Sequence, residues 1–483
     1  MKKWFCAALS AVVFFTALGL SACKKEEKVG CRYEITAEYR EDARTLAGTV
    51  KVDFSNQTDG EISELKFNLY PNAYRKNALY APISEGHFAA AYYDGADYGG
   101  VTVTSVNGAK NWSIEGEDEN ILLVTLYRAL SPSDKLTIDI SFVTELAKVN
   151  HRLGVTAHAV NLGNAFPSLC AYENGEFVEN VYAPVGDPFK SVCADYKINL
   201  TLPSDYVVAA TGRAEITKGL ESKTKYAFEA ERVRDFSFVF SKQFEVLEKN
   251  VDGVTVKYYY YDDKEAAAHL SLATAALDYF SDTFGDYTYP IFSLAQTGFC
   301  YGGMEYPALV MLSDSLGEEE YRRSIVHETA HQWWYAVVGS DQINEAWQDE
   351  SLAEYSAIDF FEKHSDYGLT RDELVRDCLQ EYRSYFSVYG SVFGQIDTKM
   401  SRPLSEYSSE YEYRCLAYDK GVIMWDTLKK SIGEKKFYQG LKNYYKMNKF
   451  KTATPADLIA AFEKTGVSVD GFFHSFLSGK AVI

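Results

Sequence analysis

The chain has 483 residues, 47% of them hydrophobic and 24% charged, which is the composition of a globular protein long enough for two or more domains. Its formal net charge of −19 at pH 7 argues against a strongly basic face. Nucleic acid is therefore not an expected partner.

The first 22 residues have the features of an export signal. A short positive region precedes an apolar stretch from Trp4 to about Leu20, which is too short and too poorly flanked for a permanent membrane span. The stretch runs into the sequence LSAC, which ends at Cys23 and resembles the lipobox of bacterial lipoproteins, whose cysteine is lipidated and becomes the first mature residue. Cleavage after Ala22 as an ordinary signal peptide is the alternative.

We therefore expect residues 1–22 to be a lipoprotein signal peptide and residues 23–31 to be a lipidated tether. The protein would be exported and held on the extracytoplasmic side of a cell-envelope membrane through Cys23. An exported location permits disulfides, and Cys170 with Cys193 is the first pair to test. The cysteine spacings contain no CxxC pair, so a cysteine zinc site is not expected.

An alternating apolar and polar pattern runs from about Tyr33 to Val246 and predicts β-strands. Turn signals such as Asp59-Gly60 separate the alternating segments. We therefore expect an all-β N-terminal domain, saddle-like or sandwich-like, over residues 32–250. The clearest alternating segments are 33–37, 48–54 and 196–202.

The pattern changes to helical spacing in residues 251–483. Residues 264–284 form an alanine-rich helical segment. Asp314 or Ser315 is the expected N-cap of a helix whose first turn carries three glutamates, as the helix dipole favours. Thr454 precedes a proline and marks another helix start. The second half is thus predicted to be a mainly helical α+β domain.

One motif in this second half carries the chemistry. His327-Glu328-Thr329-Ala330-His331 places two imidazoles four residues apart, on one face of a helix, where both reach a single metal ion. Glu328 lies beside the first imidazole and is positioned to take a proton from a water that the metal activates.

A catalytic zinc ion needs three protein ligands and an open position. Glu350 follows His331 after 18 intervening residues and opens a second predicted helix. A turn between the two helices brings this carboxylate to the histidines. We therefore predict one Zn²⁺ ion held by His327, His331 and Glu350.

This spacing resembles that of the zinc aminopeptidase family of gluzincins, which includes aminopeptidase N and leukotriene hydrolase. Upstream, the string Gly302-Gly303-Met304-Glu305-Tyr306 resembles the exopeptidase motif Gly-x-Met-Glu-Asn of that family. The resemblance implies that Gly302, Gly303 and Met304 lie along the substrate and that Glu305 binds its free α-amino group. A fixed carboxylate is a suitable partner for a terminal ammonium. Tyr306 replaces the asparagine of the family motif.

Two further residues complete the predicted site. Tyr418 begins the string Tyr-Asp-Lys-Gly, which resembles a family segment whose tyrosine donates a hydrogen bond to the tetrahedral oxyanion. Glu354 lies one helical turn after Glu350 and is a candidate to fix the ring of His327 from behind, with a solvated charge as the alternative. From the β domain, Asn164 or the region 186–188 is a candidate to lie near the cleft.

The resemblance implies a short bacterial lipoprotein member of the family, with a thermolysin-like catalytic domain after the β domain. The implied activity is hydrolysis of the N-terminal bond of peptides that have a free N-terminus. A thermolysin-like zinc endopeptidase and a catalytically inactive lipoprotein that captures peptides remain as alternatives. Epoxide hydrolysis, known from one branch of the family, also stays open.

Overall fold

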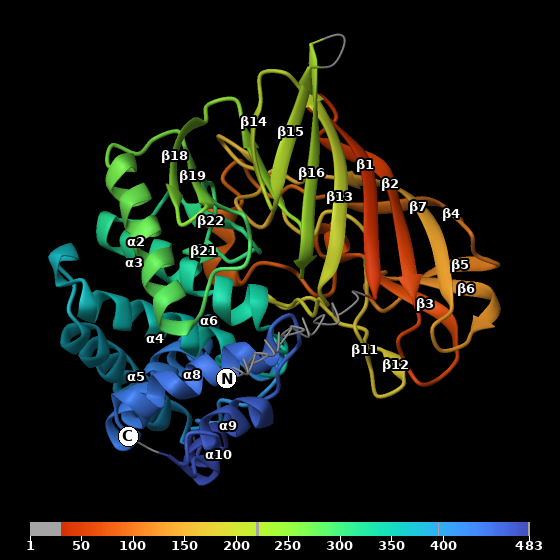
Figure 1. Ribbon diagram of the computed structural model, residues 1–483. Helices are drawn as coiled ribbons and strands as arrows, with labels where there is room; N and C mark the ends of the chain where they lie inside the picture. The colour runs from red at the N-terminus through yellow and green to blue at the C-terminus, as the bar shows by residue number, and fades with distance from the viewer. Residues whose placement is uncertain (1–29, 219–221, 395, 482–483) are drawn as a thin grey trace, which may run out of the picture.

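The computed structural model describes residues 30–218, 222–394 and 396–481, and its two halves differ in architecture (Figure 1). The N-terminal half consists of strands, drawn from red to yellow-green, and the C-terminal half is mainly helical, drawn from green to blue. This order confirms the predicted fold class of a β-rich region followed by a helical one. The predicted signal peptide and Cys23 lie outside the described residues. Within the described ranges, each helix is too short or too polar to span a bilayer.

A seven-stranded sheet forms the body of the N-terminal half. Its central strands alternate buried and solvent-facing side chains, so one face packs against the core. Strands β1 and β13 run parallel to each other, and the other neighbouring strands of this sheet are antiparallel. In spatial order the strands are β15 (Arg213–Lys218), β16 (Lys223–Val233), β13 (Ala194–Pro203), β1 (Cys31–Arg40), β2 (Thr45–Ser55), β7 (Lys135–Glu145) and β4 (Gly100–Asn107).

Three smaller sheets complete this half. One four-stranded sheet has the order β10 (Ser168–Leu169), β3 (Ile62–Asn68), β6 (Ile121–Leu130) and β5 (Asn111–Glu115). A second has the order β14 (Val207–Ala210), β17 (Phe238–Ser241), β9 (Val160–Leu162) and β8 (Leu153–Val155). A hairpin joins β11 (Tyr172–Glu173) to β12 (Glu176–Phe177), and short helical turns occupy η1 (Tyr70–Tyr74), η2 (Glu85–His87) and α1 (Phe88–Ala91).

A five-stranded sheet opens the C-terminal half and carries the segment with the exopeptidase-like motif. Its order is β18 (Glu245–Val251), β19 (Val254–Tyr260), β20 (Ile291–Thr297), β22 (Leu309–Ser313) and β21 (Gly303–Met304). Two of the three inner strands, β20 and β22, run parallel and are buried along their whole length, because both faces of the sheet are covered. The short β21 lies at the edge of the sheet, where Gly303 is half-buried and the Met304 side chain is buried.

Helices surround the end of this sheet. They are α2 (Ala266–Phe284), α3 (Glu318–Ala330), the π-helical η3 (Gln332–Val337), α4 (Trp347–Lys363), η4 (Ser365–Tyr367), α5 (Arg371–Phe393), η5 (Leu404–Glu406), α6 (Glu410–Tyr413), the π-helical η6 (Arg414–Asp419), α7 (Lys420–Ile432), α8 (Glu434–Asn448), α9 (Pro455–Glu463) and α10 (Asp470–Leu477).

The N-termini of two helices show where local sequence signals predicted the N-cap residue correctly and where they did not. Thr454 caps α9 by accepting a hydrogen bond from the backbone N–H of Asp457, as predicted. The predicted cap of α3 is wrong, because the N-cap residue is Gly317 and not Asp314 or Ser315. The Glu320 carboxylate accepts a hydrogen bond from the Gly317 N–H at 3.2 Å, so an acidic first-turn residue supplies the cap that Gly317 lacks.

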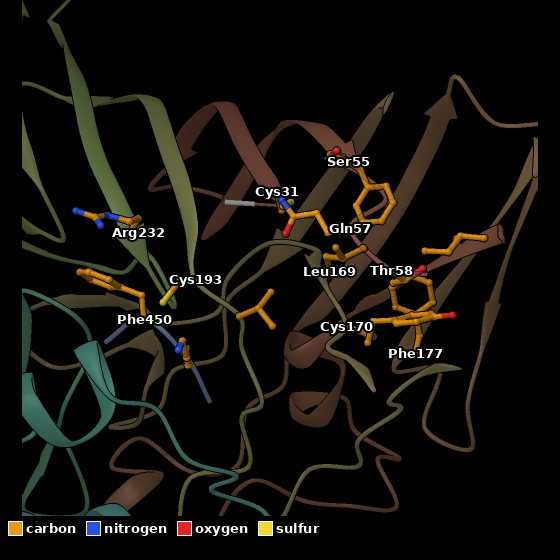
Figure 2. A pocket seen from close by; sticks show the side chains of 16 residues that line it. Cys31, Ser55, Gln57, Thr58, Leu169, Cys170, Phe177, Cys193, Arg232 and Phe450 are labelled. Carbon is orange, nitrogen blue, oxygen red and sulfur yellow. The ribbon is translucent and has the colours of Figure 1, made fainter. Parts of the chain in front are cut away.

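The suggested pairing of Cys170 with Cys193 is also wrong, because both thiols are unpaired in the structure. The two cysteines line one cavity of about 580 Å³, together with Cys31 and with Phe450 from the helical half (Figure 2). Burial raises the pKa of the Cys170 thiol above its usual range. Cys31 and Cys170 are therefore buried apolar groups near the junction of the two halves, and Cys193 is half-buried there.

Candidate active site

The three predicted metal-binding atoms converge where α3, η3 and α4 meet. The Nε2 atoms of His327 and His331 lie 3.0 Å apart. The Oε2 atom of Glu350 lies 3.4 Å from the first and 3.3 Å from the second. Ligand atoms at normal zinc distances in a tetrahedral site are separated by roughly 3.4 Å, so the three atoms fit one Zn²⁺ ion.

Hydrogen bonds behind the histidines orient both rings. The Nδ1 of His327 lies 2.8 Å from Glu354 Oε2, and the Nδ1 of His331 lies 3.0 Å from the carbonyl oxygen of Trp334. Each acceptor selects the tautomer that carries its proton on Nδ1, which leaves the Nε2 lone pair directed at the other ligands. Glu354 thus occupies the position that its helical spacing suggested.

Glu354 is held in its charged form. Burial raises the pKa of this carboxyl, but hydrogen bonds from His327 and Arg323 outweigh burial and bring the pKa to about 2. The Arg323 guanidinium donates to Glu354 Oε1 at 3.1 Å. These contacts connect the ring of His327 to Glu354 on α4 and, through it, to Arg323 one turn earlier on α3.

The helix α3, which carries the first metal-binding histidine, changes geometry at the second one, His331. Regular α-helix ends at Ala330, His331 is the C-cap, and the backbone widens into the π-helical η3. The wider turn directs the carbonyl of Trp334 back at His331. The φ and ψ angles of Trp334 and Tyr335 are not helical, so the backbone kinks there, and the carbonyl of Trp334 faces the ring of His331.

Two more carboxylates stand beside the ligand set. Glu305, Glu328 and His331 each offer one ligand-type atom, and these atoms all lie within 4.8 Å of one another. The Oε2 atom of Glu328 is buried and has no hydrogen-bond partner among the described residues. Burial raises the pKa of Glu328, which suits a carboxylate that exchanges a proton near neutral pH.

Gly303 allows this close arrangement. A Cβ atom at position 303 would lie 2.3 Å from Glu328 Oε1, well inside contact distance. The edge strand β21 can therefore lie against the metal helix only because the residue is glycine. Gly302 and Met304 flank it, and the Met304 sulfur lies 3.0 Å from the Nε of the buried Arg152.

Tyr418 lies on η6, next to the first metal-binding histidine. Its ring stacks on the ring of His327 with 5.9 Å between the centroids and 15° between the planes. Burial and the neighbouring Glu350 raise the pKa of Tyr418 well above its usual range, so the phenol keeps its proton. Tyr413, five residues earlier, directs its hydroxyl at Glu350 Oε1 across 3.4 Å, a contact that no sequence motif announced.

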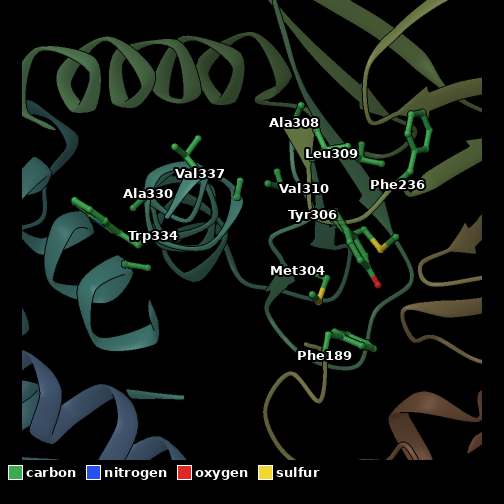
Figure 3. Close-up of a cluster of buried hydrophobic side chains, with 14 of the residues drawn as sticks. Phe189, Phe236, Met304, Tyr306, Ala308, Leu309, Val310, Ala330, Trp334 and Val337 are labelled. Carbon is green, nitrogen blue, oxygen red and sulfur yellow. The ribbon is translucent and has the colours of Figure 1, made fainter. Parts of the chain in front are cut away.

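Tyr306, the departure from the family motif, points away from the metal. Its hydroxyl donates to Asn164 Oδ1 at 2.7 Å, and Figure 3 shows the ring directed away from the helix that carries Ala330. Asn164 donates in turn to Asp235 at 3.2 Å, and the same carboxylate accepts from the hydroxyl of Tyr335 on η3 at 2.6 Å. The larger side chain is thus accommodated by a polar partner from the β-rich half.

The other region suggested from the β-rich half also lies near the site. Asp187 accepts a hydrogen bond from Arg152, and both side chains are buried. Burial and the charge of Glu305 raise the pKa of Asp187 above its usual range. Sequence reasoning named Asn164 and residues 186–188 but missed Arg152 and Asp235, which have no motif around them.

Two histidines four residues apart and a glutamate from the next helix, behind a β-rich domain, define the gluzincin class of metallopeptidase. Residues 268–476 match the family model described as the Peptidase family M1 domain. The second half of the chain is therefore a peptidase family M1 domain.

Curated relatives agree with this family. The chain is 26% identical over 233 residues to glutamyl aminopeptidase of Bos taurus, which covers 44% of this chain and 23% of that protein. It is 25% identical over 232 residues to aminopeptidase N of Lactococcus lactis, covering 43% of this chain and 26% of that protein. The chain spans about a quarter of the length of these relatives.

Solved structures share the fold over nearly the whole chain. An M1 zinc metallopeptidase from Deinococcus radiodurans superposes with a TM-score of 0.65 at 16% identity, covering 94% of this chain and 96% of that one. A mutant of that enzyme bound to a Tyr-Ser-Ala substrate superposes with a TM-score of 0.64 at 14% identity and the same coverage. The two-domain architecture is therefore common to these proteins.

Proposed function

We propose that the protein is a zinc-dependent aminopeptidase, which hydrolyses the N-terminal bond of peptides that have a free N-terminus. The observation that carries this proposal is the position of Glu305. Its carboxylate lies within 4.8 Å of both Glu328 and the ligand atom of His331. An α-ammonium bound there would place the first peptide bond of the substrate beside the metal position. The substrate would not extend beyond its N-terminal residue on that side.

His327, His331 and Glu350 would hold the metal. When bound, Zn²⁺ lowers the pKa of a water ligand and polarises the scissile carbonyl. Glu328 would accept the proton of the attacking water and deliver it to the leaving amine. The raised pKa of Glu328 favours this two-way transfer.

Tyr418 and Glu305 would act on the substrate itself. The phenol of Tyr418 would donate a hydrogen bond to the oxygen that becomes negative during attack, and its raised pKa keeps that proton available. Glu305 would pair with the α-ammonium, while Gly302, Gly303 and Met304 present their backbone along the substrate. The names of the curated relatives and the tripeptide complex of one structural neighbour support this assignment.

The test compares matched substrates of the zinc-loaded protein. Leucine anilide should be hydrolysed, and its N-acetyl derivative should be hydrolysed at least about 100-fold more slowly, because the acetyl group removes the charge that Glu305 binds. Equal rates on the two substrates, or cleavage inside N-acetylated peptides, would favour the endopeptidase alternative. Stoichiometric zinc with no turnover would favour a peptide-capturing protein.

The cellular location is part of the same proposal. The sequence LSAC supports lipidation of Cys23 after export, with the catalytic domain outside the cytoplasm. Cys23→Ala should shift the protein from the membrane fraction to the soluble fraction. A variant that stays membrane-bound would remove the lipid anchor from the proposal.

A further inference from the structure

The buried amide of Gln342 makes contacts that no motif assigns. Gln342 lies between η3 and α4, inside the 18-residue stretch that separates His331 from Glu350, and only 2% of its surface is exposed. Its Nε2 donates to Glu305 Oε1 and to Asp349 Oδ2, each at 2.8 Å. One side chain therefore connects the proposed amine anchor to the residue directly before a metal ligand.

The orientation of this amide follows from its neighbours. The Glu305 carboxylate only accepts hydrogen bonds, so the NH₂ end of the amide faces it, and the same nitrogen also reaches Asp349 Oδ2. The two N–H groups serve the two carboxylates, one each. Glu305 and Asp349 are 3% and 2% exposed, and water cannot easily replace this donor.

A neutral donor is the significant feature of this arrangement. Lysine or arginine at position 342 would place a second cation on Glu305 and would compete with the substrate ammonium. An apolar side chain would leave the Glu305 carboxylate without a donor. The amide fixes the carboxylate and leaves its negative charge for the substrate.

The hydrogen bonds to Glu305 agree with this arrangement, in which the amide holds the carboxylate and the substrate takes up its charge. Within the described part of the chain, Gln342 is the only residue that donates a hydrogen bond to this carboxylate. The second oxygen, Oε2, is thus left for a ligand. Asp349 precedes Glu350 on α4, so the same amide contacts both the amine anchor and the helix that carries a metal ligand.

We propose that Gln342 is a positioning residue that holds Glu305 in register with the metal and so determines how strongly the enzyme selects a free N-terminus. The inference rests on the proposed aminopeptidase function. It assigns selectivity for the ammonium group to a side chain that contacts neither substrate nor metal.

The test measures binding of two ligands to the zinc-loaded protein by titration calorimetry. The ligands are leucine hydroxamate and 4-methylpentanohydroxamate, which chelate the metal alike and differ only in the α-amino group. We expect the native protein to bind the amino ligand at least about tenfold more tightly, as a charge-assisted contact requires. In Gln342→Met, this preference should fall by about tenfold, while binding of the ligand without the amine changes less than about twofold.

Two controls separate positioning from general damage. Gln439→Met makes the same substitution at an exposed glutamine, whose amide donates to Asn443, and should alter neither ligand. In a Glu305→Gln background, Gln342→Met should produce no further loss of preference, because the carboxylate on which it acts is gone. Gln342→Asn, which keeps an amide on a shorter arm, should fall between the native protein and Gln342→Met and serves if the methionine variant does not fold.

The outcomes distinguish this inference from the function on which it rests. A native protein with no preference for the amino ligand would contradict the aminopeptidase proposal itself. A large native preference that Gln342→Met leaves unchanged would overturn only the role of Gln342. Equal weakening of both ligands would also overturn it, because the residue would then support the metal site as a whole.

Discussion

The metal centre and the amine-anchor segment are adjacent, yet they are held in different ways. The metal centre is supported from within the helical half, by Glu354 and by the carbonyl of Trp334. The anchor segment around Glu305 is supported across the molecule, through Tyr306 to Asn164 and Asp235 of the β-rich half. The supports of the metal ligands therefore come from one half, whereas those of the anchor segment come from both, with Gln342 on the helical side.

This difference predicts that substitutions in the two regions will change different kinetic constants. Substitutions at the metal centre should lower kcat, because they affect only the reacting atoms. Substitutions in the anchor network should mainly raise KM for substrates with a free amine, because they displace the group that binds the ammonium.

The largest effect is expected from Glu328→Gln. Loss of the proton acceptor should lower kcat by about 10³-fold, within the usual range for a general base, while zinc content stays at one ion per chain. Steady-state kinetics together with metal analysis measures both. Turnover within tenfold of the native rate would show that another group takes the proton.

The next effect is expected from Tyr418→Phe. The ring that stacks on His327 is retained and only the donor is lost, so kcat should fall by about 10²-fold with KM nearly unchanged. The exposed Tyr127→Phe is a matched control that should behave as the native enzyme. A rise in KM without a fall in kcat would place Tyr418 on the substrate-binding side of the comparison.

Tyr306→Phe examines the anchor side. It leaves the buried Asn164 Oδ1 without its donor, so the free energy of unfolding should drop by about 1–3 kcal/mol. We expect KM for leucine anilide to rise several-fold while kcat changes less than about twofold. Urea denaturation and steady-state kinetics provide the two values, and a change confined to kcat would contradict the separation of the two regions.

The smallest effect is expected on the pH dependence of the melting temperature, through a histidine that contacts the first turn of α3. Burial lowers the pKa of His269, but its hydrogen bond to Asp263 and the charge of Glu318 on α3 outweigh burial and leave the pKa raised. A raised folded-state pKa stabilises the fold fully below the unfolded value near 6.5 and less as pH rises through the folded value. His269→Gln should therefore flatten the pH dependence of the melting temperature above pH 6. An unchanged profile would show that the pair contributes nothing to stability.

Local patterns were sufficient for the elements whose signals lie within a few residues. The alternation in 33–37 and 196–202 became β1 and β13, and Thr454 became a helix cap. Local patterns did not predict Gly317 as the N-cap of α3, because the capping acceptor is the side chain of Glu320, three residues later. They failed also at Cys170 and Cys193, since sequence does not report the distance between two thiols.

The metal-binding set lies on two short segments, so its spacing made it visible in the sequence, and the structure brings those atoms within 3.4 Å of one another. Helical periodicity places His327 and His331 on one face of α3, and it places Glu354 on the same face of α4 as Glu350. The partners of Glu305 and Tyr306 come from positions as distant as Asn164, and no period connects them. Only the tertiary structure decided which side chains hold the amine anchor, with Gln342 from the helical half and Asn164 from the β-rich half, because buried polar groups must find their partners wherever the fold places them.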